Sequence, residues 1–454
     1  MASTFLTRTA GSAVAAERKK YTISVWVKRS TVGVEHAVCS AGNGGGSEEF
    51  TIRFDSTDKL NCFHYNGSSM VGQLITNRLF RDVNAWYHIY FVYDSANSTQ
   101  ADRFMLYING ERETSFSTNT GLTQNDLSPW NVDERHQIGS NSWANSGNGN
   151  GIFDGVMSHF YNVAGSHIAV TEFGSTDSTT GEWKINTSPT ISSYGTDGFL
   201  VLKDGNTATD QSPNSNNFTI TGSLTKTEDN PSNVFATLNP LTYSATKWNL
   251  EYGNLRTNGL AAGEAAAWRS VYGTIGASSG KYYFEMKVTR TASDPNNFRV
   301  GIVDAEQMKY AGDNASFINE SRGYGYQGTN GNVVNGGVNT SYGDSYTTND
   351  IIGCAFDLDN HKIYWSKNGV WQNSGDPTSG STGTGSAYNL ATGYTYLPTV
   401  SHYYDDDRIE LNFGNGYFGT SAISSAGTNA SNNGIFEYDV PTGYTALSTK
   451  GLNL

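Results

Sequence analysis

The stretch DLDNHKIYWSKNGVW, residues 357–371, decides the fold of the second half of this chain. Its acidic and amide residues, Asp357, Asp359 and Asn360, are candidate ligands for a metal ion, because hard cations prefer clustered oxygen atoms. An EF-hand calcium loop would place glycine at its sixth position, where this chain has Lys362, and a glutamate several residues later, which is missing. The spacing therefore argues against a calcium loop.

The apolar residues on both sides of this turn region follow the period of two that is typical of β-strands. They are Ile352, Cys354, Phe356, Leu358, Ile363 and Trp365. The alternation reverses at residues 359–361, which are therefore predicted to form the tip of a hairpin. Asn368-Gly369 is predicted to form the next turn, because Asn-Gly between alternating strands is a strong hairpin signal.

The composition of the 454 residues favours an all-β protein with two antiparallel sandwiches. Glycine is abundant, with 51 residues, proline is scarce, with 9, and aromatic residues make up 13% of the chain. This composition fits short strands joined by many turns. No long window keeps the 3.6-residue apolar period of a helix.

The net charge of −13, without a long basic run, makes nucleic acid and anionic membranes poor partners. Carbohydrate, protein and cations are better ones. No apolar stretch approaches the roughly 20 residues that span a membrane. The N-terminus lacks the pattern of a signal peptide, so we expect the chain to fold where it is synthesised.

The three cysteines, Cys39, Cys62 and Cys354, form no metal-binding or redox motif. We interpret them as small buried apolar residues in a reducing compartment. A bridge between Cys39 and Cys62 stays open as an alternative.

Strand patterns divide the chain into four parts. We predict a first sandwich in residues 1–170, a connector with some strands in 171–239, a second β-rich domain in 240–420 and an extended tail in 421–454. The connector contains two apolar alternations, 198–204 and 217–222. We predict that they return to pair with the first sandwich.

The first part resembles a laminin-G-like, concanavalin A-like jelly roll. The stretches that carry the resemblance are YTISVWVKRS (21–30), WYHIYFVYDSANS (86–98), RFMLYINGERETS (103–115), HQIGSN (136–141) and FDGVMSHFYNVAG (153–165). The segment 197–223 is similar to the stretch that opens such domains, but here it follows the domain. The resemblance thus implies a permuted arrangement.

The second domain resembles the SPRY family. The matching stretches are SGKYYFEMKV (279–288), VGIVD (300–304), GYGYQ (323–327), the long segment 342–371, YLPTVSH (396–402) and RIELNFG (408–414). The resemblance implies a sandwich that binds protein partners through its loops and is not known for catalysis.

The combination of these domains, with STFLTRTAGSA (3–13) at the front and PTGYTAL (441–447) at the back, resembles virion proteins of tailed bacteriophages. It implies a non-enzymatic tail fibre, spike or capsid-surface fibre that binds host-surface glycan or a neighbouring virion protein. It further implies a homo-oligomer, commonly a trimer, on the virion surface after assembly in the host cytoplasm. A capsid decoration protein without a host ligand and an extracellular carbohydrate-active enzyme stay open as alternatives.

The sequence lacks the motifs of known catalytic sites, which argues against an enzyme. Retaining glucanases of the concanavalin A-like class carry two glutamates close together on one strand face, as in Glu-x-Asp-x-Glu. Here Glu48-Glu49 and Asp133-Glu134 are adjacent pairs, whose side chains point to opposite faces of a strand. The chain also lacks the G-x-S-x-G and H-E-x-x-H motifs.

Two groups of residues are candidate binding sites. Asp94, Asp102, Asp133 and Asp154 lie near predicted strand ends and are candidate ligands for Ca²⁺; no other cofactor is expected. Candidate ligand-binding residues in predicted loops are Asn141, Trp143, Tyr346, Trp371, Tyr403 and Tyr404. Aromatic loop residues give contact area at a low entropy cost.

Overall fold

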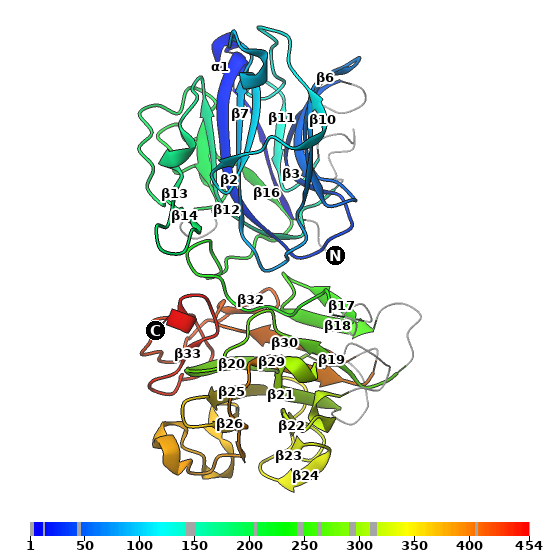
Figure 1. Cartoon of the computed structure of the whole chain (residues 1–454), viewed down its shortest axis with the longest axis vertical. Coiled ribbons are helices and arrows are strands. Elements are labelled where there is room, and N and C mark those ends of the chain that lie inside the picture. The colour runs from blue at the N-terminus through cyan, green and yellow to red at the C-terminus, as the bar shows by residue number, and fades with distance from the viewer. Residues whose placement is uncertain are drawn as a thin grey trace. The chain divides into compact units, whose positions relative to one another are not determined.

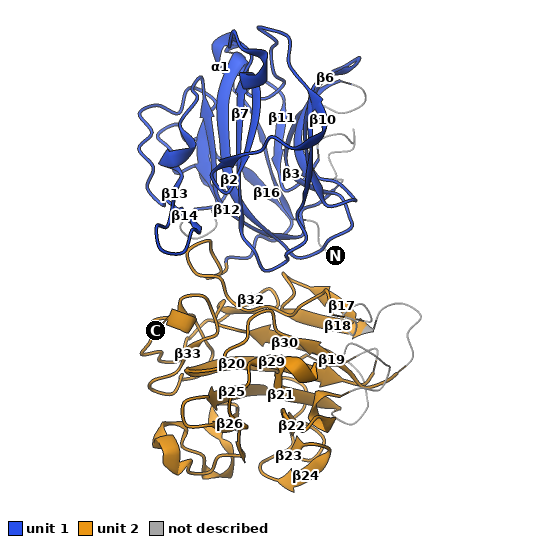
Figure 2. Ribbon diagram, viewed as in Figure 1, with its two compact units in different colours: residues 1–226 blue, residues 227–454 orange. Residues whose placement is uncertain are grey.

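The computed structural model describes residues 4–11, 14–42, 47–141, 151–203, 207–242, 248–260, 266–289, 297–308, 316–404 and 407–453. The chain forms two compact units, residues 1–226 and residues 227–454 (Figure 2). Almost all strand pairs in both units are antiparallel, and each unit pairs two large sheets. This confirms the predicted all-β fold with two sandwiches.

In its described residues, unit 1 contains an eight-stranded and a six-stranded sheet (Figure 1). The eight-stranded sheet runs in the order β10 (Phe116–Thr120), β6 (Met70–Leu79), β5 (Lys59–Asn66), β4 (Glu48–Phe54), β3 (His36–Gly42), β11 (Arg135–Ile138), β1 (Phe5–Thr9) and β16 (Thr219–Thr221). The six-stranded sheet runs in the order β15 (Phe199–Val201), β12 (Gly155–Ala164), β2 (Lys20–Arg29), β7 (Tyr87–Asp94), β8 (Phe104–Ile108) and β9 (Glu111–Arg112). The remaining elements are the hairpin β13 (Gly174–Thr176) and β14 (Trp183–Ile185), the short helix α1 (Ala15–Lys19) and the 3-10 turns η1 (Gln100–Asp102) and η2 (Val170–Glu172).

The core of unit 1 lies between its two sheets, because alternate residues of each strand face inward. Tyr21 stacks on Tyr93 with ring centroids 5.1 Å apart and meets Phe50 of the opposite sheet edge-on at 5.8 Å. Cys39 and Cys62 are also buried here, and both are free thiols. Ile52 of β4 pairs with each of them, so they lie two strands apart. Two strand spacings are about 9.6 Å, too far for a disulfide.

Two strands of the predicted connector belong to unit 1. β15 pairs with β12, and β16 pairs with the N-terminal strand β1. The unit extends to residue 226, beyond the predicted boundary at 170. Apolar residues explain the difference, since Phe199, Val201 and Phe218 are buried in the same core as the first strands.

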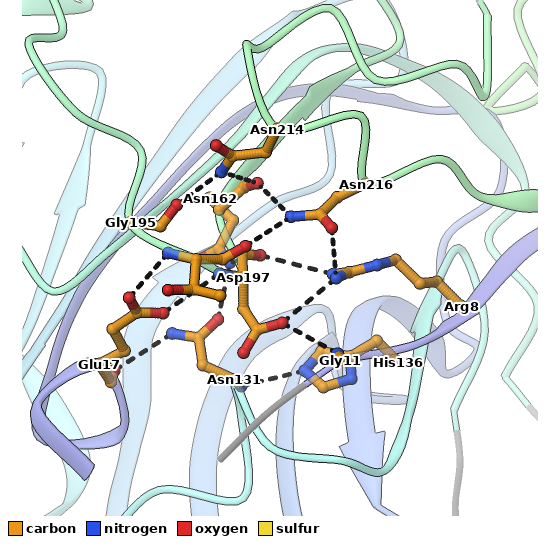
Figure 3. A network of polar contacts seen from close by, with 12 residues as sticks. Arg8, Gly11, Glu17, Asn131, His136, Asn162, Gly195, Asp197, Asn214 and Asn216 are labelled. Carbon is orange, nitrogen blue, oxygen red and sulfur yellow. Dashed lines mark hydrogen bonds and ion pairs between the residues drawn. The ribbon is translucent and has the colours of Figure 1, made fainter. Parts of the chain in front are cut away.

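A buried polar network joins the N-terminal segment of unit 1 to this returning segment (Figure 3). The Asp197 carboxylate accepts hydrogen bonds from the Arg8 guanidinium at 3.2 Å and from the Gly11 backbone N–H at 3.1 Å. The Glu17 carboxylate accepts from the backbone N–H groups of Thr196 and Asp197. These contacts bridge more than 170 residues of sequence.

Asparagine amides complete the network (Figure 3). The side-chain N–H groups of Asn214 and Asn216 both donate to the Gly198 carbonyl, and Asn162 donates to the Asp197 carbonyl. The Asn216 side-chain oxygen accepts from Arg8 at 2.7 Å. Backbone groups of the 195–198 segment are thus satisfied by side chains and not by a sheet ladder, which is how a buried loop avoids unpaired carbonyls.

His136 lies at one end of the network as a neutral ring. Its Nε2 accepts from the Asn131 backbone N–H at 3.0 Å, so its Nδ1 carries the proton and donates to the Glu134 carbonyl at 2.9 Å. Complete burial lowers the pKa of His136 to about 4. This histidine is therefore a structural residue.

In its described residues, unit 2 contains a nine-stranded and a six-stranded sheet (Figure 1). The nine-stranded sheet contains β17 (Trp248–Glu251), β18 (Arg256–Leu260), β30 (Arg408–Asn412), β20 (Lys281–Val288), β25 (Ile351–Asp357), β26 (Lys362–Lys367) and β27 (Val370–Trp371), with β28 (Tyr388–Asn389) beside β26 and β33 (Thr445–Ala446) beside β20. The six-stranded sheet runs in the order β19 (Arg269–Tyr272), β29 (Tyr396–His402), β21 (Phe298–Asp304), β22 (Gly323–Gln327), β23 (Asn332–Asn335) and β24 (Val338–Ser341). A small hairpin, β31 (Tyr417–Phe418) and β32 (Ser421–Ala422), and the 3-10 turns η4 (Ala305–Gln307), η5 (Phe317–Asn319), η6 (Gln372–Ser374), η7 (Pro377–Thr382) and η8 (Gly451–Asn453) complete it.

The stretch 357–371 forms the hairpins that its pattern predicts. β25 and β26 pair in register up to Asp357 opposite Lys362. The buried Asp357 carboxylate accepts from the backbone N–H groups of Asp359 and Asn360 and pairs with Lys281 at 3.0 Å. Asn368 and Gly369 have φ of 50° and 82°, the left-handed values that a tight hairpin turn requires. The acids of this stretch therefore stabilise a turn.

We predicted an extended tail for residues 421–454, but the described part of this segment, residues 421–453, does not form one. They return to unit 2, where β33 pairs in parallel with β20. Phe436, Val440 and Tyr444 pack on Tyr283 and Ala355 in a buried apolar cluster. The segment packs instead of staying extended because burial of these apolar side chains outweighs the conformational entropy that an unordered tail would keep.

A buried carboxylate fastens this C-terminal segment. Glu285 of β20 accepts from the backbone N–H groups of Glu437 and Tyr438, each at 2.9 Å. The Asn412 amide and the Tyr283 hydroxyl donate to it as well, at 3.1 Å each. Burial raises the pKa of Glu285 to about 7, against the effect of these four donors.

Candidate functional site

An arginine and three aromatic side chains form a continuous cluster at one end of the six-stranded sheet of unit 2. The Arg299 guanidinium carbon lies 3.2 Å from the centre of the Trp268 ring. Trp268 meets Tyr403 edge-on at 5.5 Å, and Tyr403 meets Tyr404 edge-on at 4.7 Å. All four residues are half-buried. We call these four residues the Arg299 cluster.

Neighbouring strands of the sheet position this cluster. Trp268 directly precedes β19, Arg299 lies in β21, and Tyr403 and Tyr404 follow β29. β29 pairs with both β19 and β21, so the three strands are adjacent. A backbone hydrogen bond from the Ala267 N–H to the Tyr403 carbonyl, at 3.1 Å, ties two of the segments together.

Arg299 is a cation without a carboxylate partner among the described residues. Burial lowers its pKa to about 10, and the one group that opposes this effect is the Tyr346 hydroxyl. Its Nε is buried and has no hydrogen-bond partner among the described residues. A second arginine of this unit over a ring, Arg322 above Tyr394 at 4.0 Å, has Asp304 at 2.6 Å from its Nε. Arg299 is therefore able to pair with an external acceptor.

Arginine, tryptophan and tyrosine are the residue types that dominate the energy of protein interfaces. A guanidinium stacked on an indole keeps its edge free for hydrogen bonds while its face is desolvated. Two tyrosines beside it extend the contact area at a low entropy cost. The geometry of the Arg299 cluster is thus suited to binding a surface of another molecule.

The structure brings together two of the predicted ligand-binding residues, Tyr403 and Tyr404. Trp268 and Arg299 were missed, although the sequence carries a weak signal for each. Trp268 follows three alanines in EAAAW (264–268), where small neighbours leave a large ring accessible. Arg299 is the one charged residue of the stretch FRVGIV (298–303), whose other residues are apolar or glycine.

The other predicted aromatic and amide residues lie elsewhere. Tyr346 is only 1% exposed, and its hydroxyl donates to the Tyr326 carbonyl, so the prediction of a loop contact is wrong for this core residue. Trp371 is half-buried and packs edge-on against Tyr283 at 6.4 Å. Asn141 is buried. Trp143 lies outside the described residues.

The four aspartates predicted to bind Ca²⁺ do not gather at one point. Asp94 pairs with Lys20 at 3.1 Å, and Asp102 pairs with Arg112 at 2.8 Å. Asp154 accepts a hydrogen bond from the Thr31 hydroxyl, and Asp133 is exposed. Within the described ranges, no three acidic, histidine or cysteine side chains form a metal-binding group. Three of these carboxylates have a separate local partner and do not converge on a common point, which corrects the prediction.

Comparison with known families agrees with this architecture. Residues 7–169 match the concanavalin A-like lectin/glucanases superfamily, and residues 281–416 match the SPRY domain. The chain therefore carries one domain of each class, as the sequence predicted.

Similar proteins come from animals. A Ran-binding proteins 9/10 homolog of Drosophila melanogaster is 34% identical over 127 residues, which are 27% of this chain and 12% of that protein. Ran-binding protein 9 of Xenopus tropicalis is 29% identical over 181 residues, which are 37% of this chain and 28% of that protein. The chain thus spans less than a third of the length of these relatives.

Solved structures of SPRY domains are similar to part of the chain. The SPRY domain of human HERC1 has a TM-score of 0.25 at 17% identity, over 32% of this chain and 83% of that structure. Another human SPRY domain has a TM-score of 0.27 at 16% identity, over 36% of this chain and 94% of that structure.

The relatives overturn the predicted role in a bacteriophage virion. They are Ran-binding proteins of animals and not fibre, spike or decoration proteins. The prediction of a fibre protein, of virion proteins and host glycans as partners, and of a place on the virion surface is therefore wrong. That prediction relied on the combination of two folds with short terminal motifs. Such a combination does not determine function, because one fold serves many unrelated proteins. No helix in the described ranges is long and apolar enough to cross a membrane.

Proposed function

We propose that this chain is an interaction protein whose SPRY domain binds a protein partner at the Arg299 cluster. The observation that carries the proposal is the Arg299 guanidinium, 3.2 Å above Trp268 and without a carboxylate partner in the described ranges. A partially desolvated cation of this kind gains most when a partner supplies a carboxylate or carbonyl oxygen.

The names of the relatives suggest a first partner to test. They are Ran-binding proteins, so Ran is the protein that we propose to test against this chain. We also propose that the role is binding and not catalysis. The Arg299 cluster offers a cation and aromatic rings but no carboxylate, imidazole or thiol.

Trp268→Ala is expected to weaken binding of Ran to the full chain by about 30-fold, because loss of a central interface aromatic costs about 2 kcal/mol. Arg299→Lys is expected to weaken it less, since the charge stays while the stacked, forked geometry is lost. Isothermal titration calorimetry with purified proteins measures both.

Tyr252→Ala is the matched control. Tyr252 is 42% exposed and also carries an arginine over its ring, Arg256 at 5.3 Å, but that arginine is paired with carboxylates in the same unit. Its loss should leave binding unchanged. Equal affinity of Trp268→Ala and the wild type would reject the Arg299 cluster as the binding site. Absence of Ran binding to the wild type would reject Ran.

A further inference from the structure

A groove opens at the side of unit 1 where both sheets end. The eight-stranded sheet ends there with β10, and the six-stranded sheet ends with β9. The groove has a volume of about 580 Å³, within the range that binds small ligands or a few side chains. One wall contains Leu74, Phe116 and Asn119, and the other contains Ala101, Phe104 and Leu106.

The strand β10 along this groove is an open edge. In the described part of the chain it pairs with β6 alone. The Ser117 hydroxyl donates a hydrogen bond to the Ile75 carbonyl, so this carbonyl points toward β10. Thr118 lies opposite Ile75, and its backbone N–H and C=O therefore point back toward β6. Backbone directions alternate along a strand, so the N–H and C=O of Asn119 face outward.

Apart from a register irregularity between Phe116 and Thr118, this edge does little to prevent strand pairing, and Asn119 lies past that irregularity. Natural edge strands carry charges or proline that block the approach of another chain. Residues 114–124, TSFSTNTGLTQ, contain neither. The charges at the rim of the groove are already paired, Asp102 with Arg112 at 2.8 Å and Glu113 with Arg78 at 2.9 Å. Lys59 reaches β10, with its ammonium 3.4 Å from the Ser117 hydroxyl, but it does not line the groove. The groove itself therefore carries no unpaired charge among its lining residues and suits an uncharged segment.

We propose that an extended, uncharged segment of a protein partner adds to β10 as a further strand. Its backbone pairs with the outward groups of Asn119, and one apolar side chain enters the groove beside Phe104 and Phe116. Main-chain hydrogen bonds supply affinity in such strand addition, and the pocket supplies specificity. This binding site lies in unit 1 and is independent of the Arg299 cluster.

Asn119→Pro tests the proposal, because proline removes the outward N–H and is tolerated at an edge strand. The probe is a library of random uncharged heptapeptides, displayed on ribosomes and selected on the immobilised full chain. We expect peptides with alternating apolar residues, whose Kd rises at least about tenfold on Asn119→Pro, or about 1.4 kcal/mol. Asp177→Ala, on the β13–β14 hairpin of the same unit and outside the groove, is the control and should change Kd by less than about twofold.

Ala101→Trp provides a second test from the opposite wall. Ala101 is exposed and does not belong to β10, so this variant fills the groove without changing the edge strand. It should also abolish binding of the selected peptides, and it decides the question if Asn119→Pro does not fold. Selection of no peptide, or equal binding to wild type and Ala101→Trp, would overturn the proposal.

Discussion

Asp197→Ala is expected to lower the free energy of unfolding of unit 1 by about 3–5 kcal/mol. The side chains of Arg8 and Asp197 are 8% and 1% exposed, so removal of the carboxylate leaves a buried cation without its partner. Burial already raises the pKa of Asp197 and lowers that of Arg8, which shows that both charges are held at a desolvation cost. The change also leaves the Gly11 N–H without its acceptor.

Hydrogen exchange in increasing urea, followed by mass spectrometry on peptides from β1 and β12, measures this effect in the full chain. Asp177→Ala is the control, because Asp177 pairs with Lys184 at 2.7 Å on the exposed β13–β14 hairpin of the same unit. An exposed pair contributes little, so the urea midpoint should hardly move. A small effect of Asp197→Ala would show that the buried network is not required for the docking of the 195–216 segment.

Ionisation of Glu285 is expected to cost unit 2 about 3 kcal/mol as the pH rises from about 4.5 to above 7. The folded state holds the proton more tightly than the unfolded state, because the pKa of Glu285 is raised to about 7. Its contribution to stability is therefore fully present below the unfolded pKa and is lost as the pH rises through the folded pKa.

Glu285→Gln isolates this effect. His402 of the same unit changes the stability in the opposite direction with pH, since burial lowers its pKa to about 3. The quantity to measure is therefore the difference in the free energy of unfolding between the wild type and the variant. Urea unfolding is measured between pH 4.5 and pH 8 by hydrogen exchange of peptides from β20. Over this range, the free energy of unfolding of the variant should rise by about 3 kcal/mol relative to that of the wild type. Glu306→Gln, with a side chain 78% exposed, should show no such trend. A constant difference for Glu285→Gln would contradict the expectation.

Local patterns predicted much of the strand content. The period of two in residues 21–28, 48–55 and 281–289 lies within or largely within β2, β4 and β20. Asn109-Gly110 adopts the positive φ values of a hairpin turn, 50° and 80°. These features depend on neighbouring residues only, which is why the amino-acid sequence of this one chain was enough to predict them.

The candidate site was predicted only in part, for a physical reason. Tyr346 and Tyr403 both lie in Tyr-rich loop sequence, yet Tyr346 is buried and Tyr403 is half-exposed beside Trp268. Burial depends on which segments pack over a residue, and a tyrosine is compatible with either environment. The stacking of Arg299 on Trp268 joins residues that are 31 positions apart, and no local pattern indicates it.

The sequence by itself determined that this protein is built from antiparallel strands in two sandwiches and where its main hairpins turn, because alternation and turn chemistry act over a few residues. Only the tertiary structure decided where residues 421–453 pack, that Arg8 pairs with Asp197 at a separation of 189 residues, and that Glu285 holds the C-terminal segment in place. Apolar burial has no direction, and the entropy of closing a loop grows only slowly with its length. Several distant segments could therefore cover the same apolar surface at a similar entropy cost, and only the packing of the folded chain determines which one does.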